Sequence, residues 1–204
     1  MTMNTSPDKS PQEHTKIVDA TREWLVRAVI GLNLCPFAKA VEVKDRIRYV
    51  LSDADGPETL YQDLSRELLY LHAADAEQLE TSLLIHPYAL NDFLDYNDFL
   101  DVADALIEDL QLDGEIQIAS FHPRYQFAGT AADAIENYTN RSPYPMLQLL
   151  RESSIEAASD SFADVSQIYE RNIETLRAMG KSGLERLGVF TFPEHSPANR
   201  KPKK

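Results

Sequence analysis

The sequence predicts an α/β fold, or an α+β fold, of a single domain. We expect a small mixed sheet of three or four strands, covered by helices and followed by two C-terminal helices. Two observations support this prediction. Short apolar runs alternate along the chain with longer segments of helical periodicity, which favours β-α-β crossovers. The chain has 204 residues, 43% of them hydrophobic and 26% charged, which is the composition of one globular domain.

The globular domain is expected over residues 14–180. Residues 1–13 are polar and are expected to form a disordered tail without a signal-peptide core. The first helix should begin near His14, because apolar side chains then recur at helical spacing. Cys35-Pro36 should stop it, since a residue before proline is pushed out of the helical region.

Alternating apolar side chains over 41–51 predict a β-hairpin, or at least one strand over 46–52. Pro57 suits the first position of a second helix. An apolar strand is expected over 81–85, and a long helix over 91–111.

The pattern of the remaining chain predicts a strand, an irregular stretch and two helices. Proline is favoured in the first turn of a helix and glycine after its last turn. The expected elements are a strand over 116–121, a long loop over 122–145, a helix that begins at Pro145, a helix over 161–179 that Gly180 ends, and a basic, partly disordered tail over 181–204.

The net charge of −13 is unevenly distributed. Between Glu67 and Pro123 there are 13 Asp or Glu and no Lys or Arg. Such a surface repels phosphate backbones, so we expect no nucleic-acid partner. No apolar run is long enough to span a bilayer, and a single cysteine favours a reducing, cytoplasmic setting. We therefore expect no membrane partner; the oligomeric state stays open.

Aspartates recur through the predicted helix over 91–111. Asp95, Asp98, Asp101 and Asp104 fall opposite its apolar face. The EF-hand spacing of calcium-binding loops is missing. We therefore expect these carboxylates to be solvated, with Phe99, Ala103 and Ile107 buried, and we predict no metal and no cofactor.

Four segments of the chain resemble an uncharacterised bacterial family, domain of unknown function 1415. The resemblance covers about residues 15–180 and implies no particular reaction, cofactor or catalytic residue. The segments are Gly31–Ala38, Asp95–Leu100, Phe121–Thr130 and Asn140–Pro145.

Two of the predicted strands end in His-Pro, at His86 and His122. In parallel strands, both imidazoles would lie with Ser52–Asp53 at the carboxyl edge of the sheet, where open α/β sheets bind ligands. His122 is a candidate general acid or base and His86 a candidate substrate-binding residue. Either His-Pro pair could instead simply end its strand. Tyr125, in the loop that follows, is a candidate for orienting a substrate.

Arg141 lies before the helix expected at Pro145. A guanidinium beside a helix N-terminus would bind a small anion, and Ser142 and Tyr144 are further candidate binding residues. The alternative for Arg141 is a salt bridge to the acidic body. Cys35 is a candidate nucleophile if a histidine lies nearby; the alternative is a small buried side chain.

Two functions remain open. The first is a small enzyme that acts on a small anionic metabolite. In it His122 would serve as general acid or base, Arg141 would bind the anion, and Cys35 would be a candidate nucleophile. The second is a non-catalytic module that binds a ligand or a protein through the loop over 122–145. The first requires Cys35, His122 and Arg141 to line one pocket.

Overall fold

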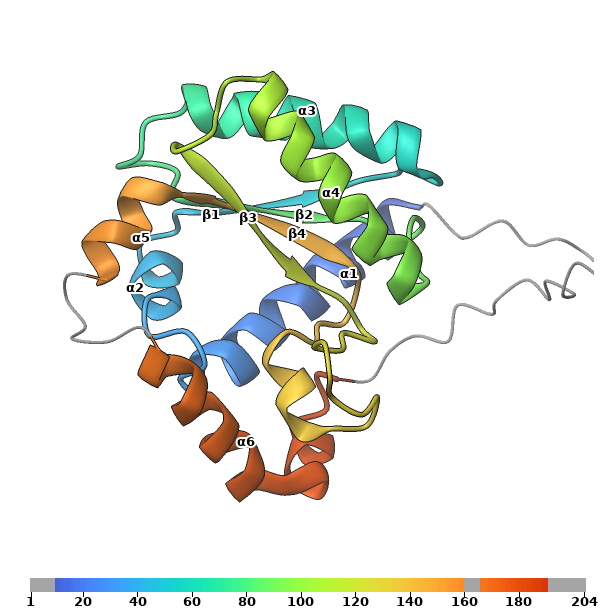
Figure 1. Ribbon diagram of the computed structural model, residues 1–204, viewed down its shortest axis with the longest axis vertical. Coiled ribbons are helices and arrows are strands. Elements are labelled where there is room, and N and C mark those ends of the chain that lie inside the picture. The colour runs from blue at the N-terminus through green and yellow to red at the C-terminus, as the bar shows by residue number, and fades with distance from the viewer. Residues whose placement is uncertain (1–9, 160–165, 191–204) are drawn as a thin grey trace, which may run out of the picture.

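The computed structural model describes residues 10–159 and 166–190, which form three layers with a four-stranded mixed sheet in the middle (Figure 1). The strand order is β1-β2-β4-β3. Strands β1 and β2 are parallel, and β4 is antiparallel to both of its neighbours, β2 and β3. The strand bounds are Ile47–Leu51 for β1, Thr81–Ile85 for β2, Ile116–Phe121 for β3 and Met146–Arg151 for β4.

Helices cover both faces of the sheet (Figure 1). Helices α3 (Pro57–Ala73) and α4 (Phe93–Asp109) cover one face. The other face carries α1 (Pro11–Trp24), the π-helix η1 (Leu25–Ile30) and α2 (Ala38–Val43). Among the described residues, no helix is both long enough and apolar enough to span a membrane.

The C-terminal part packs beside these layers. Helix α5 (Glu152–Ser159) follows β4 directly, and α6 (Ser166–Leu187) packs against the 3-10 helix η2 (Ile135–Thr139). Asn172 of α6 is buried and donates a 2.8 Å hydrogen bond to the Leu34 carbonyl, which ties α6 to the segment that follows η1.

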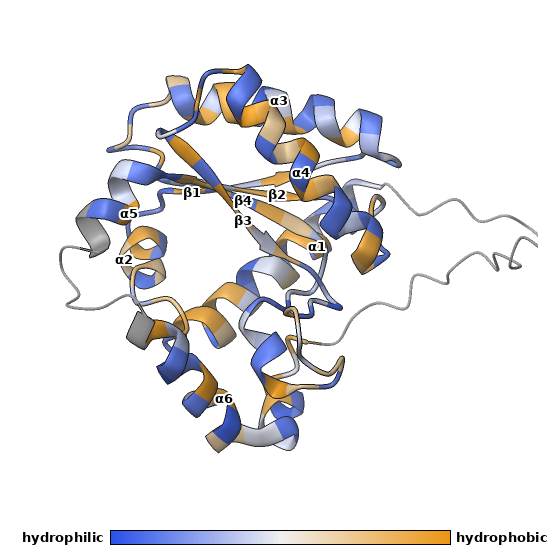
Figure 2. Cartoon of the chain, in the orientation of Figure 1, coloured by the Kyte–Doolittle hydropathy of each residue, from blue (hydrophilic) through white to orange (hydrophobic). Residues whose placement is uncertain are grey.

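Alternation along the strands divides the interior into two cores. In β2, Leu84 belongs to the core under α3 and α4, whereas Leu83 and Ile85 belong to the core under α1 and η1. Side chains of successive residues point to opposite faces of a sheet, so each buried strand must be apolar on both faces. Strands β2 and β4 are hydrophobic along most of their length (Figure 2).

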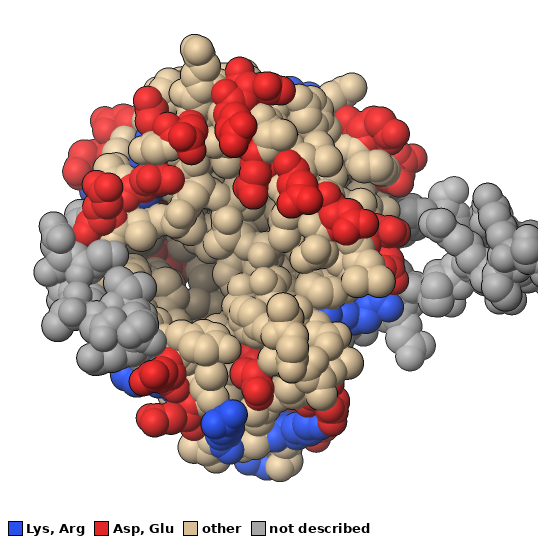
Figure 3. Space-filling model, in the orientation of Figure 1, with Lys and Arg blue, Asp and Glu red and all other residues tan. Residues whose placement is uncertain are grey.

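The predicted α/β class is confirmed, as are the strands over 81–85 and 116–121, the helix from Pro57 and the helix near 91–111. Helix α4 meets the prediction for its side chains. Phe99, Ala103 and Ile107 are buried. All four aspartates of the predicted polar face are exposed, and Figure 3 shows a line of carboxylates over α4.

The hairpin predicted over 41–51 is wrong, whereas the alternative, one strand over 46–52, is confirmed as β1. Val41 and Val43 lie in the short helix α2, where Val43 is 78% exposed. Asp45, at φ 52°, turns the chain into β1. Strand β1 pairs with the distant β2, and three alternating residues are too few to distinguish a helix from a strand.

The helix predicted to begin at Pro145 is also wrong, because Met146–Arg151 forms β4. Met146, Leu147 and Leu149 are completely buried. A run that is mostly apolar on both faces suits a central strand, and Pro145, which has no N–H to donate, fits the position just before it.

The helix ends also differ from the prediction. Helix α1 begins at Pro11, because the Ser10 side chain accepts from the Glu13 amide and caps it. Helix α6 kinks at Gly180, at φ 66°, and continues to Leu187, so the described chain beyond 180 is not a tail: Leu184 is buried. The tails expected within 1–9 and 191–204 lie outside the described residues, as do 161–165.

The π-helix η1 depends on Gly31. The Gly31 amide donates to the Val26 carbonyl five residues back, which is the wide turn of a π-helix. A Cβ atom at Gly31 would lie 2.3 Å from the Arg27 carbonyl oxygen, closer than two atoms can approach. Only glycine therefore fits this turn without moving the backbone.

We expect Gly31→Ala to lower the free energy of unfolding by about 1–3 kcal/mol, the range for a forced steric overlap. Urea denaturation followed by circular dichroism measures this. Gly56→Ala is the matched control, because a Cβ there meets nothing closer than 3.6 Å, and it should cost clearly less. Equal losses in the two variants would contradict the steric explanation.

Candidate functional site

Ser52, His86 and His122 lie at one edge of the sheet, as predicted. They directly follow β1, β2 and β3, whose carboxyl ends meet at this edge. The Ser52 amide donates to the Ile85 carbonyl, and the His86 amide donates to the Pro145 carbonyl just before β4. The strand ends therefore lie side by side, but their side chains form no open site.

The His122 imidazole is completely buried among aromatic rings, beside Phe93 and Tyr96. Its Nδ1 accepts a 3.0 Å hydrogen bond from the Arg124 amide, so Nε2 carries the proton and faces the Leu90 carbonyl oxygen at 3.3 Å. Burial is the main cause that lowers the pKa of His122 to about 3. The ring is neutral, and both nitrogens are occupied.

The His86 imidazole is buried in the same way and stacks on Tyr96, with ring centroids 5.8 Å apart. Its Nδ1 donates to the Ala89 carbonyl oxygen at 3.0 Å. Its Nε2 has no hydrogen-bond partner among the described residues. Burial lowers the pKa of His86 to about 4. Both histidines therefore lie in the core under α3 and α4, out of contact with solvent.

Arg141 holds the long loop together. Its Nε donates to the Tyr125 carbonyl, its Nη2 donates to the Ala132 carbonyl at 2.5 Å, and the guanidinium lies over the Tyr138 ring. Because β4 replaces the expected helix, no helix begins beside Arg141. Among the described residues, its hydrogen-bond partners are backbone carbonyls, and none of the recorded ion pairs there includes it.

The other candidate residues of the loop also serve its structure. Ser142 is buried and donates a 2.6 Å hydrogen bond to the Tyr144 carbonyl. Tyr144 is itself 9% exposed, and burial raises its pKa. The Tyr125 ring packs between Phe93 and Phe127. The loop is thus folded over the core through its aromatic side chains.

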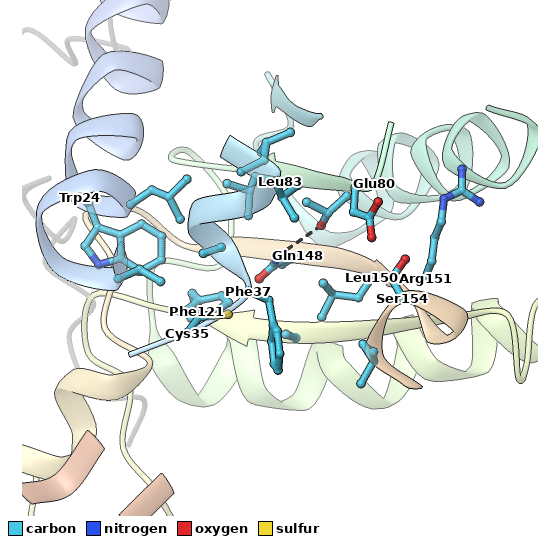
Figure 4. A pocket seen from close by; sticks show the side chains of 18 residues that line it. Trp24, Cys35, Phe37, Glu80, Leu83, Phe121, Gln148, Leu150, Arg151 and Ser154 are labelled. Carbon is cyan, nitrogen blue, oxygen red and sulfur yellow. Dashed lines mark hydrogen bonds between the residues drawn. The ribbon is translucent and has the colours of Figure 1, made fainter. Parts of the chain in front are cut away.

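A cavity of about 290 Å³ lies on the opposite face of the sheet, under α1, η1 and α2 (Figure 4). Figure 3 shows a hollow on this side, between α2 and β3. Every strand contributes to the cavity. Its lining residues are Trp24, Leu25, Val29, Cys35, Phe37, Ala38, Val41, Ile47, Glu80, Thr81, Leu83, Ala119, Phe121, Gln148, Leu150, Arg151, Ser154 and Ile155.

The cavity has an apolar end and a polar end (Figure 4). Trp24 and Cys35 lie at the apolar end, whereas Glu80 and Ser154 lie at the other. The polar end is at the amino edge of β2, the edge opposite to the one predicted. Between the ends, the Gln148 Nε2 donates to Thr81 Oγ1 at 3.2 Å, and Thr81 Oγ1 donates to the Leu149 carbonyl.

Cys35 lines this cavity, but His122 and Arg141 do not, so the predicted three-residue pocket is wrong. The physical reason is the alternation of β3. Phe121 points into the cavity, and the next residue, His122, points to the face under α4. Among the described residues, no three His, Cys, Asp or Glu side chains cluster so as to hold a metal ion.

A model of a protein family of unknown function, DUF1415, matches residues 16–186, which is most of the chain. The chain belongs to the DUF1415 family. The resemblance inferred from the four segments is therefore confirmed. Comparisons with curated proteins and with solved structures find no match. Two of the four segments supply residues of the cavity in this DUF1415 protein: Cys35, Phe37 and Ala38 come from the first and Phe121 comes from the third.

Sequence reasoning missed most of the cavity. Trp24 falls within the first predicted helix, where nothing marks it as a site residue, and Glu80 directly precedes the strand predicted over 81–85. Gln148 stands in an apolar run, where a polar side chain is a signal, but the run was assigned to a helix. With β4 in place, Gln148 and Leu150 point into the cavity, and Leu147 and Leu149 point away from it.

In this DUF1415 protein the two buried histidines should make stability fall with acidification. An unfolded histidine binds its proton with a pKa near 6.5, whereas the folded pKa is about 4 for His86 and about 3 for His122. The stabilisation is therefore complete above pH 6.5 and is lost as pH falls. Each histidine should contribute a slope of about 1.4 kcal/mol per pH unit between pH 6.5 and 4.

Urea denaturation at a series of pH values measures this slope. His122→Asn retains an acceptor for the Arg124 amide. It should lower the slope by the contribution of one histidine, about 1.4 kcal/mol per pH unit. His72→Asn is the control, because His72 has a side chain 47% exposed. A slope unchanged in His122→Asn would show that His122 binds its proton as readily in the folded protein as in the unfolded chain, which would contradict the lowered pKa.

Proposed function

We propose that this protein binds a small, mostly apolar molecule in the cavity between the sheet and the layer formed by α1, η1 and α2. The observation that carries the proposal is the cavity itself, with its volume of about 290 Å³ and its predominantly apolar lining. Small-molecule sites are typically concave and apolar, with a few polar groups that fix the orientation of the ligand.

The volume indicates the size of the ligand. An apolar cavity of about 150 Å³ holds one benzene molecule. The present cavity has about twice that volume, which suits a molecule of two fused rings or a branched chain of similar bulk. The apolar side chains around it, among them Trp24, Leu83 and Phe121, would supply the hydrophobic contacts.

The surroundings of the expected catalytic residues favour a binding function over an enzymatic one. His122 has both nitrogens hydrogen-bonded inside the core, and Arg141 donates to two loop carbonyls. Cys35 lines the cavity, but no described histidine does. The action of His122 and Arg141 on an anionic metabolite therefore stays a prediction without geometric support.

The test uses 1-naphthalenemethanol, a neutral two-ring probe, in isothermal titration calorimetry. Ala119 lines the cavity from β3, and Ala119→Phe should fill part of it and weaken binding by roughly tenfold or more, about 1.4 kcal/mol. Ala105→Phe is the matched control, because Ala105 is exposed on α4 and lies outside the cavity.

Cys35, the only cysteine of the chain, gives an independent readout. Its thiol lines the cavity, so a bound probe should slow alkylation by N-ethylmaleimide in proportion to occupancy. Binding that is unaffected by Ala119→Phe, or that leaves the alkylation rate unchanged, would place the probe elsewhere and contradict the proposal.

A further inference from the structure

We infer that the cavity selects a molecule that carries an ammonium group next to its apolar body, with the ammonium at the Glu80 end. This inference rests on the proposed binding function and specifies the class of ligand. Two observations support it: the direction in which each charged side chain of the cavity points, and the hydrogen bonds and ion pairs that each already forms.

Glu80 and Arg151 are the only charged residues among the described residues of the cavity lining. In Figure 4 the Glu80 carboxylate and the Ser154 hydroxyl lie at the same end of the cavity, whereas the Arg151 guanidinium points away from it. Arg151 therefore borders the cavity without turning its positive group toward it.

The Arg151 guanidinium has its own partners at the C-terminal end of α3 and in the segment between α3 and β2. It donates to the carbonyls of Leu71 at 2.6 Å, Ala74 at 2.7 Å and Leu79 at 3.2 Å. A cation at the carbonyl end of a helix is stabilised by the helix dipole. An anionic ligand would have to compete with these three carbonyls for the guanidinium.

The Glu80 carboxylate keeps acceptor capacity. Its recorded ion-pair partner is Arg46, at 3.7 Å, which is beyond hydrogen-bond length. Arg46 is engaged more closely by Glu77, at 2.5 Å. The Glu80 side chain is 22% exposed, so water screens its charge only in part. A buried ammonium beside it would form a charge-assisted hydrogen bond.

Two further features favour a donor over an acceptor on the ligand. The Gln148 side-chain nitrogen is occupied by Thr81, which leaves the amide oxygen of Gln148 as an acceptor on the cavity wall. The net charge of −13 produces a field that concentrates cations and repels anions around the whole protein.

The experiment compares three probes with the same rings and different head groups: 1-naphthalenemethylammonium, 1-naphthalenemethanol and 1-naphthoate. Calorimetry at pH 7 should rank the ammonium tightest and the carboxylate weakest. The ammonium should exceed the alcohol by roughly tenfold, as a hydrogen bond between charged partners allows. This comparison needs no variant, so it stands even where a substitution disturbs folding.

Glu80→Gln should reduce the affinity for the ammonium probe to that for the alcohol probe. The affinity for the alcohol probe should stay within about twofold of its value in the unmodified protein. Glu77→Gln is the matched control. Glu77 also pairs with Arg46, but its side chain is 82% exposed and it does not line the cavity. It should leave the ranking of the probes unchanged.

The outcomes separate the two proposals. If the alcohol binds and the ammonium binds no better, the head-group inference is overturned while the binding function stands. Tightest binding of 1-naphthoate overturns the inference in favour of an anionic ligand. If none of the probes binds or protects Cys35, both proposals are overturned. An ammonium preference that survives Glu80→Gln assigns the charge recognition to another group and rejects the role of Glu80.

Discussion

The insertion of β4 between β2 and β3 is the constraint on which the rest of the structure depends. Without β4 the sheet would consist of the β1–β2 pair and an isolated β3. Tyr96 of α4 fixes the strand at its start, because its hydroxyl donates to the Met146 carbonyl and accepts from the Phe121 amide. One buried hydroxyl thus joins α4, β3 and β4. Loss of such a group leaves buried backbone atoms without partners, which costs more than the hydrogen bonds alone contribute.

The alternation of the strands then decides which residues share a site. The two histidines that follow β2 and β3 both pack against Tyr96, on the face where α3 and α4 exclude water, and their low pKa values follow from that burial. Phe121, one residue before His122, lines the cavity on the other face. Residues gathered at one edge of a sheet thus belong to different environments, and sharing an edge is a weaker indication of a common site than sharing a face.

Elements whose pattern is local could be predicted from the sequence. Helix α4 has an apolar stripe over four turns, and β2 is a short apolar run that stops at His86-Pro87; both need no distant partner to be recognised. Strand β4 does need one. Pro145 fits a helix start as well as the residue before a strand, and only the pairing with β2 and β3 decides. When Met146–Arg151 is taken for a helix, nothing indicates that Gln148 faces a cavity. The same error predicts a helix N-terminus beside Arg141, where the structure has a strand. The sequence does identify Cys35 as a candidate site residue. The residues that line the cavity with it include members of all four strands, and their proximity depends on strand pairing.

The size of the cavity is itself informative about function. The apolar walls of a space of about 290 Å³ lack packing partners on one side, which forfeits dispersion energy that a filled core would gain. Larger side chains at Ala38 or Ala119, both in the lining, would recover part of it. The wall at the apolar end is also built from an uncommon local structure: the π-helix η1 contributes Leu25 and Val29, and its wide turn requires glycine at position 31. π-helical turns occur frequently at functional sites, and proteins forgo stability mainly where activity needs an imperfectly packed region. The volume, the small side chains and the wide π-helical turn therefore point to the same place, the face of the sheet under α1 and α2, as the part of this fold that serves binding.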